Sequence, residues 1–208
     1  DTNMDIPGSD DKEYGVDALI SAPSPRMEVS QCGVLESKRY SINSLKGGTL
    51  SKWINRLRQK LDAFYQSPKL MDEFPSLEEC CSINLGIIMC WVHDAPDEDY
   101  FDDTFEKLLN DTVINTAPSH TNFKRVCVIT NPRILRLCAV AEKIKLSKYS
   151  YEFIYPSQLL GGDRPLVKSC VLTIEYAMSD FIIAERNRNG EAQLVVFFLG
   201  KLTAIGFK

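Results

Sequence analysis

The sequence is poor in histidine and has no recognisable catalytic motif. Only His93 and His120 occur among the 208 residues. No Ser or Cys lies in a nucleophile elbow, so a hydrolase that pairs a nucleophile with a histidine base is not indicated. Neither Gly47-Gly48 nor Gly161-Gly162 continues into the Gly-Lys-Ser/Thr sequence of a phosphate loop, and the acidic segment 94–111 lacks the pattern of a calcium loop. We therefore expect no catalytic residue, no bound metal ion and no cofactor.

Long apolar runs are also absent. No stretch approaches the roughly 18 apolar residues of a membrane span, and the first residues lack the basic and then apolar pattern of a signal peptide. The seven cysteines are odd in number and irregularly spaced. Most lie inside apolar runs, as reduced and buried cysteines do. We expect a protein of a reducing compartment, cytoplasmic or nuclear, that is peripheral to a membrane at most.

The first 32 residues differ in composition from the rest. Acids outnumber bases, three prolines occur, and large apolar residues are few. This composition is typical of a flexible segment, so we expect an acidic, Pro-containing N-terminal arm over 1–32. Residues 33–208 should then form a single domain. Within the arm, Ser21, Ala22 and Pro23 favour an extended conformation and make a possible partner-binding motif.

Hydrophobic periodicity predicts the main elements of that domain. Apolar residues recur at helical spacing from Leu50 until Ser67-Pro68 ends the pattern, which gives a basic amphipathic helix. Asn131-Pro132 is a good helix start, and Asn189-Gly190 suits a tight hairpin turn. The further expected elements are strands over 34–42, 83–92, 123–130, 149–155, 170–176, 181–185, 194–199 and 202–207, and an acidic helix over 98–110.

This order of elements favours an α+β fold. Helices alternate with strands in the first half, and strands alone fill the second half. We expect about three amphipathic helices packed on a largely antiparallel sheet, with a β-meander at the C-terminus. A doubly wound α/β sheet stays possible for the first half.

Charge occurs in blocks of alternating sign. Segments 38–69 and 124–148 are strongly basic, whereas segment 94–111 is strongly acidic. Such segregation gives a molecule opposed electrostatic faces, with which it can stack on copies of itself or hold an anionic surface. The alternative is that these residues are only the solvated sides of core helices. The basic candidates are Lys52, Arg56, Arg58, Lys60, Arg133, Arg136, Lys143 and Lys145, and the acidic candidates for self-association are Asp97, Asp99, Asp102 and Asp103.

The layout resembles that of the matrix proteins of rhabdoviruses and related negative-strand RNA viruses. Ser21-Ala22-Pro23 lies in a Pro-containing arm that precedes a compact α+β core. The resemblance implies a virion-associated structural protein that self-assembles between a membrane and a nucleocapsid, with the arm bound by host proteins. It implies no enzymatic activity.

The sequence thus predicts a non-enzymatic assembly protein that self-associates through charge-complementary faces and bridges an anionic membrane or a ribonucleoprotein. One alternative is a nucleic-acid-binding module, in which Lys and Arg hold phosphates. A second is a small enzyme or complex subunit without a recognisable motif.

Overall fold

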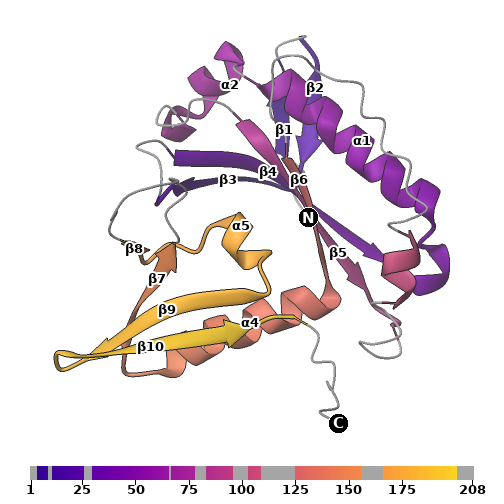
Figure 1. The fold of residues 1–208 in the computed structure, drawn as a ribbon. Helices are drawn as coiled ribbons and strands as arrows, with labels where there is room; N and C mark the ends of the chain where they lie inside the picture. Colours follow the sequence, from indigo (N-terminus) through magenta and orange to yellow (C-terminus); the bar gives the residue numbers. More distant parts are fainter. Residues whose placement is uncertain are drawn as a thin grey trace, which may run out of the picture. The chain divides into compact units, whose positions relative to one another are not determined.

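The computed structural model describes residues 4–8, 11–25, 30–65, 67–77, 83–95, 103–108, 125–155 and 166–200 (Figure 1). The chain divides into two compact units. Unit 1 comprises Asp1–Pro23 and Val29–Pro132, and unit 2 comprises Ser24–Glu28 and Arg133–Lys208. Each unit has its own hydrophobic core.

A mixed sheet forms the centre of unit 1. Its strands lie in the order β3-β4-β5-β6 among the described residues. β3 pairs with β4 in antiparallel orientation, whereas β4–β5 and β5–β6 are parallel pairs. A separate hairpin of β1 and β2 precedes this sheet. The bounds are β1 Met4–Pro7, β2 Glu13–Val16, β3 Ala18–Pro23, β4 Ser30–Tyr40, β5 Ile83–Val92 and β6 Arg125–Thr130.

Helix α1 (Gly47–Phe64) packs on this sheet through its apolar stripe. Gly86 of β5 allows the close approach, because a Cβ at that position would lie 2.7 Å from Leu57 Cδ2 and 2.9 Å from Leu57 Cγ. The stripe contributes Leu50, Trp53, Leu61 and Phe64 to the core of unit 1. Short helices follow α1 in this unit: α2 (Pro68–Glu73), a 3₁₀ turn at Pro75–Leu77 and a helical stretch over 103–108.

Unit 2 is an antiparallel sheet covered on one face by a helix. Its described strands lie in the order β10-β9-β7-β8. Helix α4 (Asn131–Leu146) supplies Leu137, Val140 and Ile144 to the core of this unit. Figure 1 shows α4 running along β9 and β10. The remaining bounds are β7 Ser150–Tyr155, β8 Val167–Ser169, α5 Ile174–Ala177, β9 Phe181–Arg188 and β10 Glu191–Phe198.

The predicted α+β class is confirmed, and most of its predicted elements are present. The predicted strand over 149–155 is β7, and the expected hairpin turn joins β9 to β10 with Asn189 at φ 55° and Gly190 at φ 86°. The sheet of unit 2 is antiparallel, as expected, but that of unit 1 is mixed. Among the described helices, none is both long and apolar enough to cross a membrane.

Several expectations need correction. Residues 4–7, 13–16 and 18–23 form strands where composition suggested a flexible arm, and two compact units replace the single domain over 33–208. The strand expected over 170–176 is instead a bend followed by α5, whose first turn is capped by the Thr173 hydroxyl. The predicted strand over 202–207 and most of the acidic helix lie outside the described residues.

The cysteines only partly follow the expectation of reduced thiols. Cys32 is disulfide-bonded. Cys90, Cys127, Cys138 and Cys170 are not disulfide-bonded, and burial raises the pKa of the Cys90 thiol to about 11. That thiol therefore stays protonated and unreactive at neutral pH.

Candidate active site

The alternation of β4 places acidic, basic and aromatic side chains on the sheet face that α1 covers. Residues two apart along a strand share a face. Val34 enters the core of unit 1, and Glu36, Lys38 and Tyr40 follow it at intervals of two. These last three line a pocket together with residues of α1. The strand thus carries a carboxylate, an ammonium group and a phenol along one line beneath the helix.

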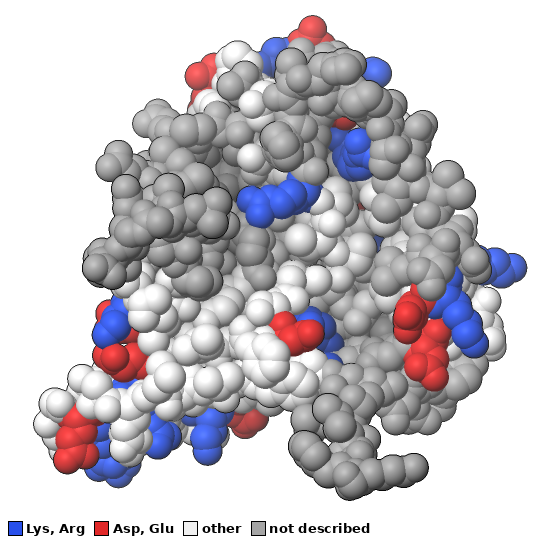
Figure 2. Space-filling model, viewed as in Figure 1, with Lys and Arg blue, Asp and Glu red and all other residues white. Residues whose placement is uncertain are grey.

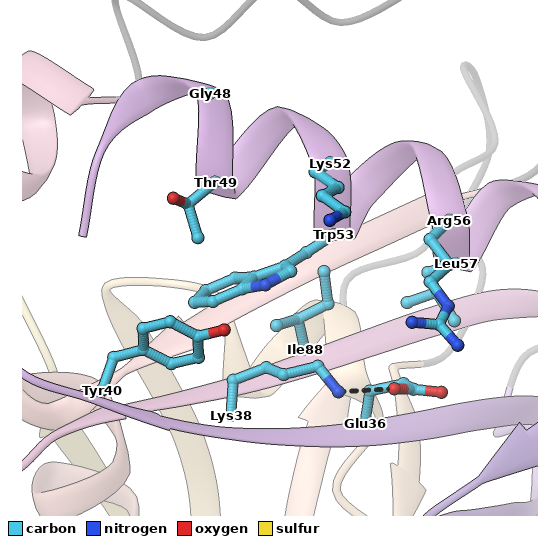
Figure 3. A pocket seen from close by; sticks show the side chains of 10 residues that line it. All are labelled: Glu36, Lys38, Tyr40, Gly48, Thr49, Lys52, Trp53, Arg56, Leu57 and Ile88. Carbon is cyan, nitrogen blue, oxygen red and sulfur yellow. Dashed lines mark hydrogen bonds and ion pairs between the residues drawn. The ribbon is translucent and has the colours of Figure 1, made fainter. Parts of the chain in front are cut away.

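The pocket has a volume of about 440 Å³ and lies within unit 1. Its remaining walls come from α1, with Ile88 of β5 between helix and strand. Figure 3 shows the side chains of Thr49 and Arg56 extending from α1 toward β4, with Arg56 close to Glu36. The residues that α1 contributes are Gly48, Thr49, Lys52, Trp53, Arg56 and Leu57.

Glu36 is a buried carboxylate of the pocket that is paired with two lysines. It is 7% exposed, and its two carboxylate oxygens accept hydrogen bonds from two different lysines. Lys38 Nζ lies 2.7 Å from Oε2, and Lys60 Nζ donates to Oε1. Burial by itself raises the pKa of Glu36, but the hydrogen bonds and positive charges of Lys38 and Lys60 outweigh it and lower that pKa below 4.5. Glu36 is therefore ionised at neutral pH.

Asp17 provides a second carboxylate beside Glu36. It lies at the bend between β2 and β3, one residue before Ala18, which pairs with Leu35. This register puts Asp17 next to Glu36, and Asp17 Oδ2 accepts a hydrogen bond from the backbone N–H of Ser37. Lys60 also donates to the carbonyl of Gly15, which ties α1 to β2 and fixes the entry to this bend.

Three cations of α1 are spaced along the side of the helix that faces the pocket and Glu36. Lys52, Arg56 and Lys60 recur every four residues and therefore share one side of the helix. Lys60 is 5% exposed and bound to Glu36, whereas Lys52 and Arg56 are exposed at the pocket. The expectation that all three lie on a solvated side is thus wrong for Lys60. Arg58 does not line the pocket.

The predicted basic residues of α4 have two different roles in unit 2: the two arginines bond to other segments, and the two lysines are exposed. Arg133 donates to the carbonyl of Ser179 and to Asp180, and Arg136 donates to the carbonyl of Leu199. These bonds join α4 to the segments that flank the sheet. Lys143 and Lys145 are exposed in the last turn of α4, where they complement the negative end of the helix dipole.

The remaining predicted residues are Ser21, Ala22 and Pro23 and the acidic set, of which the structure describes only Asp103. Ser21, Ala22 and Pro23 belong to β3, paired with Cys32, Gln31 and Ser30, rather than to a flexible motif. Asp103 is exposed, and Asp97, Asp99 and Asp102 lie outside the described residues. On the face shown in Figure 2, acidic and basic side chains of the described residues are interspersed rather than segregated.

The site thus holds one buried carboxylate, Glu36, paired with two lysines, and a half-buried carboxylate, Asp17, beside it. Comparison with known families gives the assignment. The model of the family described as GAPS4 protein PD-(D/E)XK nuclease domain matches residues 1–133, more than half of the chain. The chain belongs to this family, and the matched segment coincides with unit 1 and the start of α4. No match was found among curated proteins or among solved structures.

This assignment corrects the functional expectation. The resemblance to a viral matrix protein, and with it a non-enzymatic role in virion assembly, is contradicted because the matching family is one of nuclease domains. The expectation that the chain is not an enzyme is wrong for the same reason. The arrangement of elements that suggested the resemblance is shared by many α+β proteins, and fold alone does not specify function.

The pocket contains the second part of the motif in the family's name, an acid and a lysine separated by one residue. Glu36-Ser37-Lys38 is an Asp/Glu-X-Lys sequence on the core side of β4. Asp17 precedes Glu36 in the chain and lies beside it in space. It corresponds to the Asp of the Pro-Asp pair in the family's name, although the residue before it is Val16 rather than proline. A literal Pro-Asp pair occurs only at Pro96-Asp97, after the Glu-X-Lys sequence and outside the described residues.

Sequence reasoning missed Asp17, Glu36 and Lys38. A signal was present, because a strand over 34–42 places Glu36 and Lys38 on the same face as Val34. Charged residues at core-facing positions of a strand are expensive to bury and therefore mark a functional site or an ion pair. No comparable signal identified Asp17, whose surrounding composition predicted a flexible arm.

Proposed function

We propose that this chain is a nuclease that hydrolyses phosphodiester bonds with the help of a divalent cation bound at Asp17 and Glu36. The observation that carries the proposal is that Glu36 and Lys38 line one pocket of the unit that the nuclease family model matches, with Asp17 beside them on the backbone N–H of Ser37. The alternative of a nucleic-acid-binding module is contained in this proposal, since a nuclease must hold the strand that it cleaves.

The residues present fit a hard cation such as Mg²⁺. The described residues contain no group of three or more His, Cys, Asp or Glu side chains that could form a complete metal cage. Mg²⁺ does not require one, because it is commonly held by one or two carboxylates, with waters and substrate phosphates completing its shell. Glu36 is ionised at neutral pH, and each of its oxygens has a second lone pair beyond the one used by a lysine.

When bound, the cation would supply charge neutralisation at the phosphate and an activated water. The protein's own groups have separate tasks. Lys38 is 27% exposed at its side chain, so its ammonium group can turn from Glu36 to a phosphate oxygen and stabilise the charge that develops there. Lys52 and Arg56 hold neighbouring phosphates of the strand, and Lys60 stays with Glu36 to fix its orientation.

A metal-dependence assay tests this function. The full chain is incubated with end-labelled DNA and RNA oligonucleotides in Mg²⁺ or Mn²⁺, then in excess EDTA, then with the cation restored. We expect cleavage that stops with EDTA and resumes on re-addition. Absence of cleavage of every substrate in both cations, by protein shown to be folded, contradicts the proposal. Cleavage that is indifferent to EDTA contradicts the role of the cation.

A further inference from the structure

The end of the pocket away from Glu36 is lined by two aromatic rings. Tyr40 and Trp53 meet edge to face, with ring centroids 4.7 Å apart and an interplanar angle of 63°. Both line the pocket. Four residues separate Glu36 from Tyr40 along β4, which places the rings about 13 Å from the carboxylate pair along the strand.

Two hydrogen-bond donors at this aromatic end have no partner among the residues that the structure describes. Trp53 is 8% exposed, yet its indole N–H donates no hydrogen bond within the described part of the chain, and neither does the hydroxyl of Tyr40. A buried indole N–H normally finds a partner. Figure 3 shows the indole nitrogen on the edge of the ring nearer β4. The pocket thus offers polar groups to a ligand beside an apolar surface.

The start of α1 adds an anion-binding element at the same end. The helix begins after Lys46 with no side-chain cap and no acid in its first turn. Gly48 lines the pocket, and a Cβ there would meet no atom within 4 Å, so the backbone is open to a ligand. Backbone N–H groups at a helix start attract phosphates through unsatisfied donors and the helix dipole. The Thr49 hydroxyl and the Lys52 ammonium group are available beside them.

We propose that this end of the pocket is a nucleotide subsite, which takes an unpaired base against Tyr40 and Trp53 and its phosphate at the start of α1. The inference rests on the proposed function and names its substrate class: single-stranded nucleic acid, or a strand with an unpaired nucleotide beside the cleaved bond. A base that stacks on a protein ring inside a pocket of about 440 Å³ cannot at the same time be paired in a duplex.

The fluorescence of Trp53 tests the subsite directly. The chain has two tryptophans, and Trp91 is 38% exposed on β5 and does not line the pocket, so the Trp91→Phe variant leaves Trp53 as the reporter. The probe is a short oligothymidylate in EDTA, offered single-stranded and as a duplex with oligoadenylate. We expect saturable quenching by the single strand and little by the duplex.

A substitution in the pocket provides the second measurement. Tyr40→Leu should weaken single-strand binding about tenfold through loss of base stacking. Tyr65→Leu, at the other end of α1 and outside the pocket, should leave binding unchanged. The wild-type chain is assayed in parallel for Mg²⁺-dependent cleavage of both substrates.

The outcomes separate the subsite from the catalytic function. Faster cleavage of the single strand, with Trp53 quenching, supports both. Equal cleavage of single strand and duplex without Trp53 quenching overturns the subsite and leaves the nuclease function standing. Quenching without cleavage in any cation supports the subsite and overturns the nuclease function. Unchanged affinity in Tyr40→Leu overturns the subsite whatever the cleavage result.

Discussion

Glu36 shows how a buried charge is made tolerable at a functional site. Removing a carboxylate from water costs several kcal/mol, and the cost is offset only if its oxygens are paired and hydrogen-bonded. Lys38 and Lys60 provide that pairing from opposite sides, one from the same strand and one from α1. Lys60 is a positioning residue, because it contacts the carboxylate rather than the place where a phosphate would bind.

Replacing Lys60 should therefore affect stability first. We expect Lys60→Met to lower the free energy of unfolding by about 3 kcal/mol, the low end for a broken buried ion pair, because Lys38 still pairs with Glu36. The double variant Glu36→Leu/Lys60→Met should recover most of that loss, since apolar residues replace both charges, but should have no nuclease activity. Urea unfolding measures both. A single variant as stable as the wild type would show that the ion pair is not structural.

The lowered pKa of Glu36 predicts that the free energy of unfolding decreases at acid pH. The folded chain keeps Glu36 ionised to lower pH than the unfolded chain, whose value is near 4.5. The contribution of ionised Glu36 to the free energy of unfolding is therefore complete above that value and is lost as the pH falls through the lowered pKa. Between about pH 5 and 3, the unfolding free energy of the wild type should fall more steeply than that of Glu36→Gln. Parallel slopes would contradict the pKa direction.

Some of the individual residues of the site could be predicted from the sequence. It identified Lys52 and Arg56 as cations of one helix, because their spacing and charge are visible in the chain. It could not show that Lys60, four residues further, is buried, since burial depends on the partner across the fold. Asp17 and Glu36 are 19 positions apart, and only the pairing of β3 with β4 brings them together.

Helix α1 is the element that assembles the pocket, and its distance from β5 is set by Gly86. Leu57 and Leu61 fill the space that a side chain there would occupy. The cations on the neighbouring side of the helix are thereby held over Glu36. Any change that lifts α1 from the sheet should therefore change both packing and the geometry of the site.

Gly86→Ala tests this coupling. The added methyl group would force Leu57 to move, which should cost about 1 to 3 kcal/mol of unfolding free energy. Cleavage should decrease as well, because Arg56 and Lys60 move with the helix. Gly48→Ala is the stability control: it meets open space and should change unfolding free energy by no more than about 1 kcal/mol. Equal stability of the two variants would contradict the role assigned to Gly86.

Elements with strong local signals were predictable. The stripe of α1, the apolar run of β5 and the Asn-Gly turn each specify their structure within a few residues. The N-terminal strands were not, because β1 and β2 are ordered by pairing with each other and β3 by pairing with β4, which their own composition does not reveal. The alternation at 170–176 suggested a strand, but the Thr173 cap and short α5 prevailed there.

The whole molecule carries a net charge of −4, so attraction of nucleic acid must be local. Within the described residues, the basic blocks are not wholly exposed, because Lys60, Arg133 and Arg136 form bonds within their own units. What the fold leaves available at the pocket is Lys38, Lys52 and Arg56. Net charge and block patterns could not predict this selection.

The salt dependence of binding measures how many of these cations act. For a single strand, log affinity falls with log salt by about 0.7 per phosphate contact. The double variant Lys52→Ala/Arg56→Ala should therefore reduce the slope by about 1.4, whereas Lys143→Ala/Lys145→Ala, on exposed positions of unit 2, should leave it unchanged. The same loss in both pairs would indicate diffuse attraction rather than a defined pocket.

The most direct test of the central claim compares two single substitutions in one cleavage assay. Glu36→Gln keeps size and hydrogen-bonding capacity but removes the charge in the pocket, and Glu142→Gln makes the same change at an exposed position of α4. With Mg²⁺ and a single-stranded substrate, we expect Glu36→Gln to cleave at least about 100-fold more slowly than the wild type. Glu142→Gln should cleave at the wild-type rate. Equal rates in the two variants would contradict the assignment of the active site to Asp17, Glu36 and Lys38.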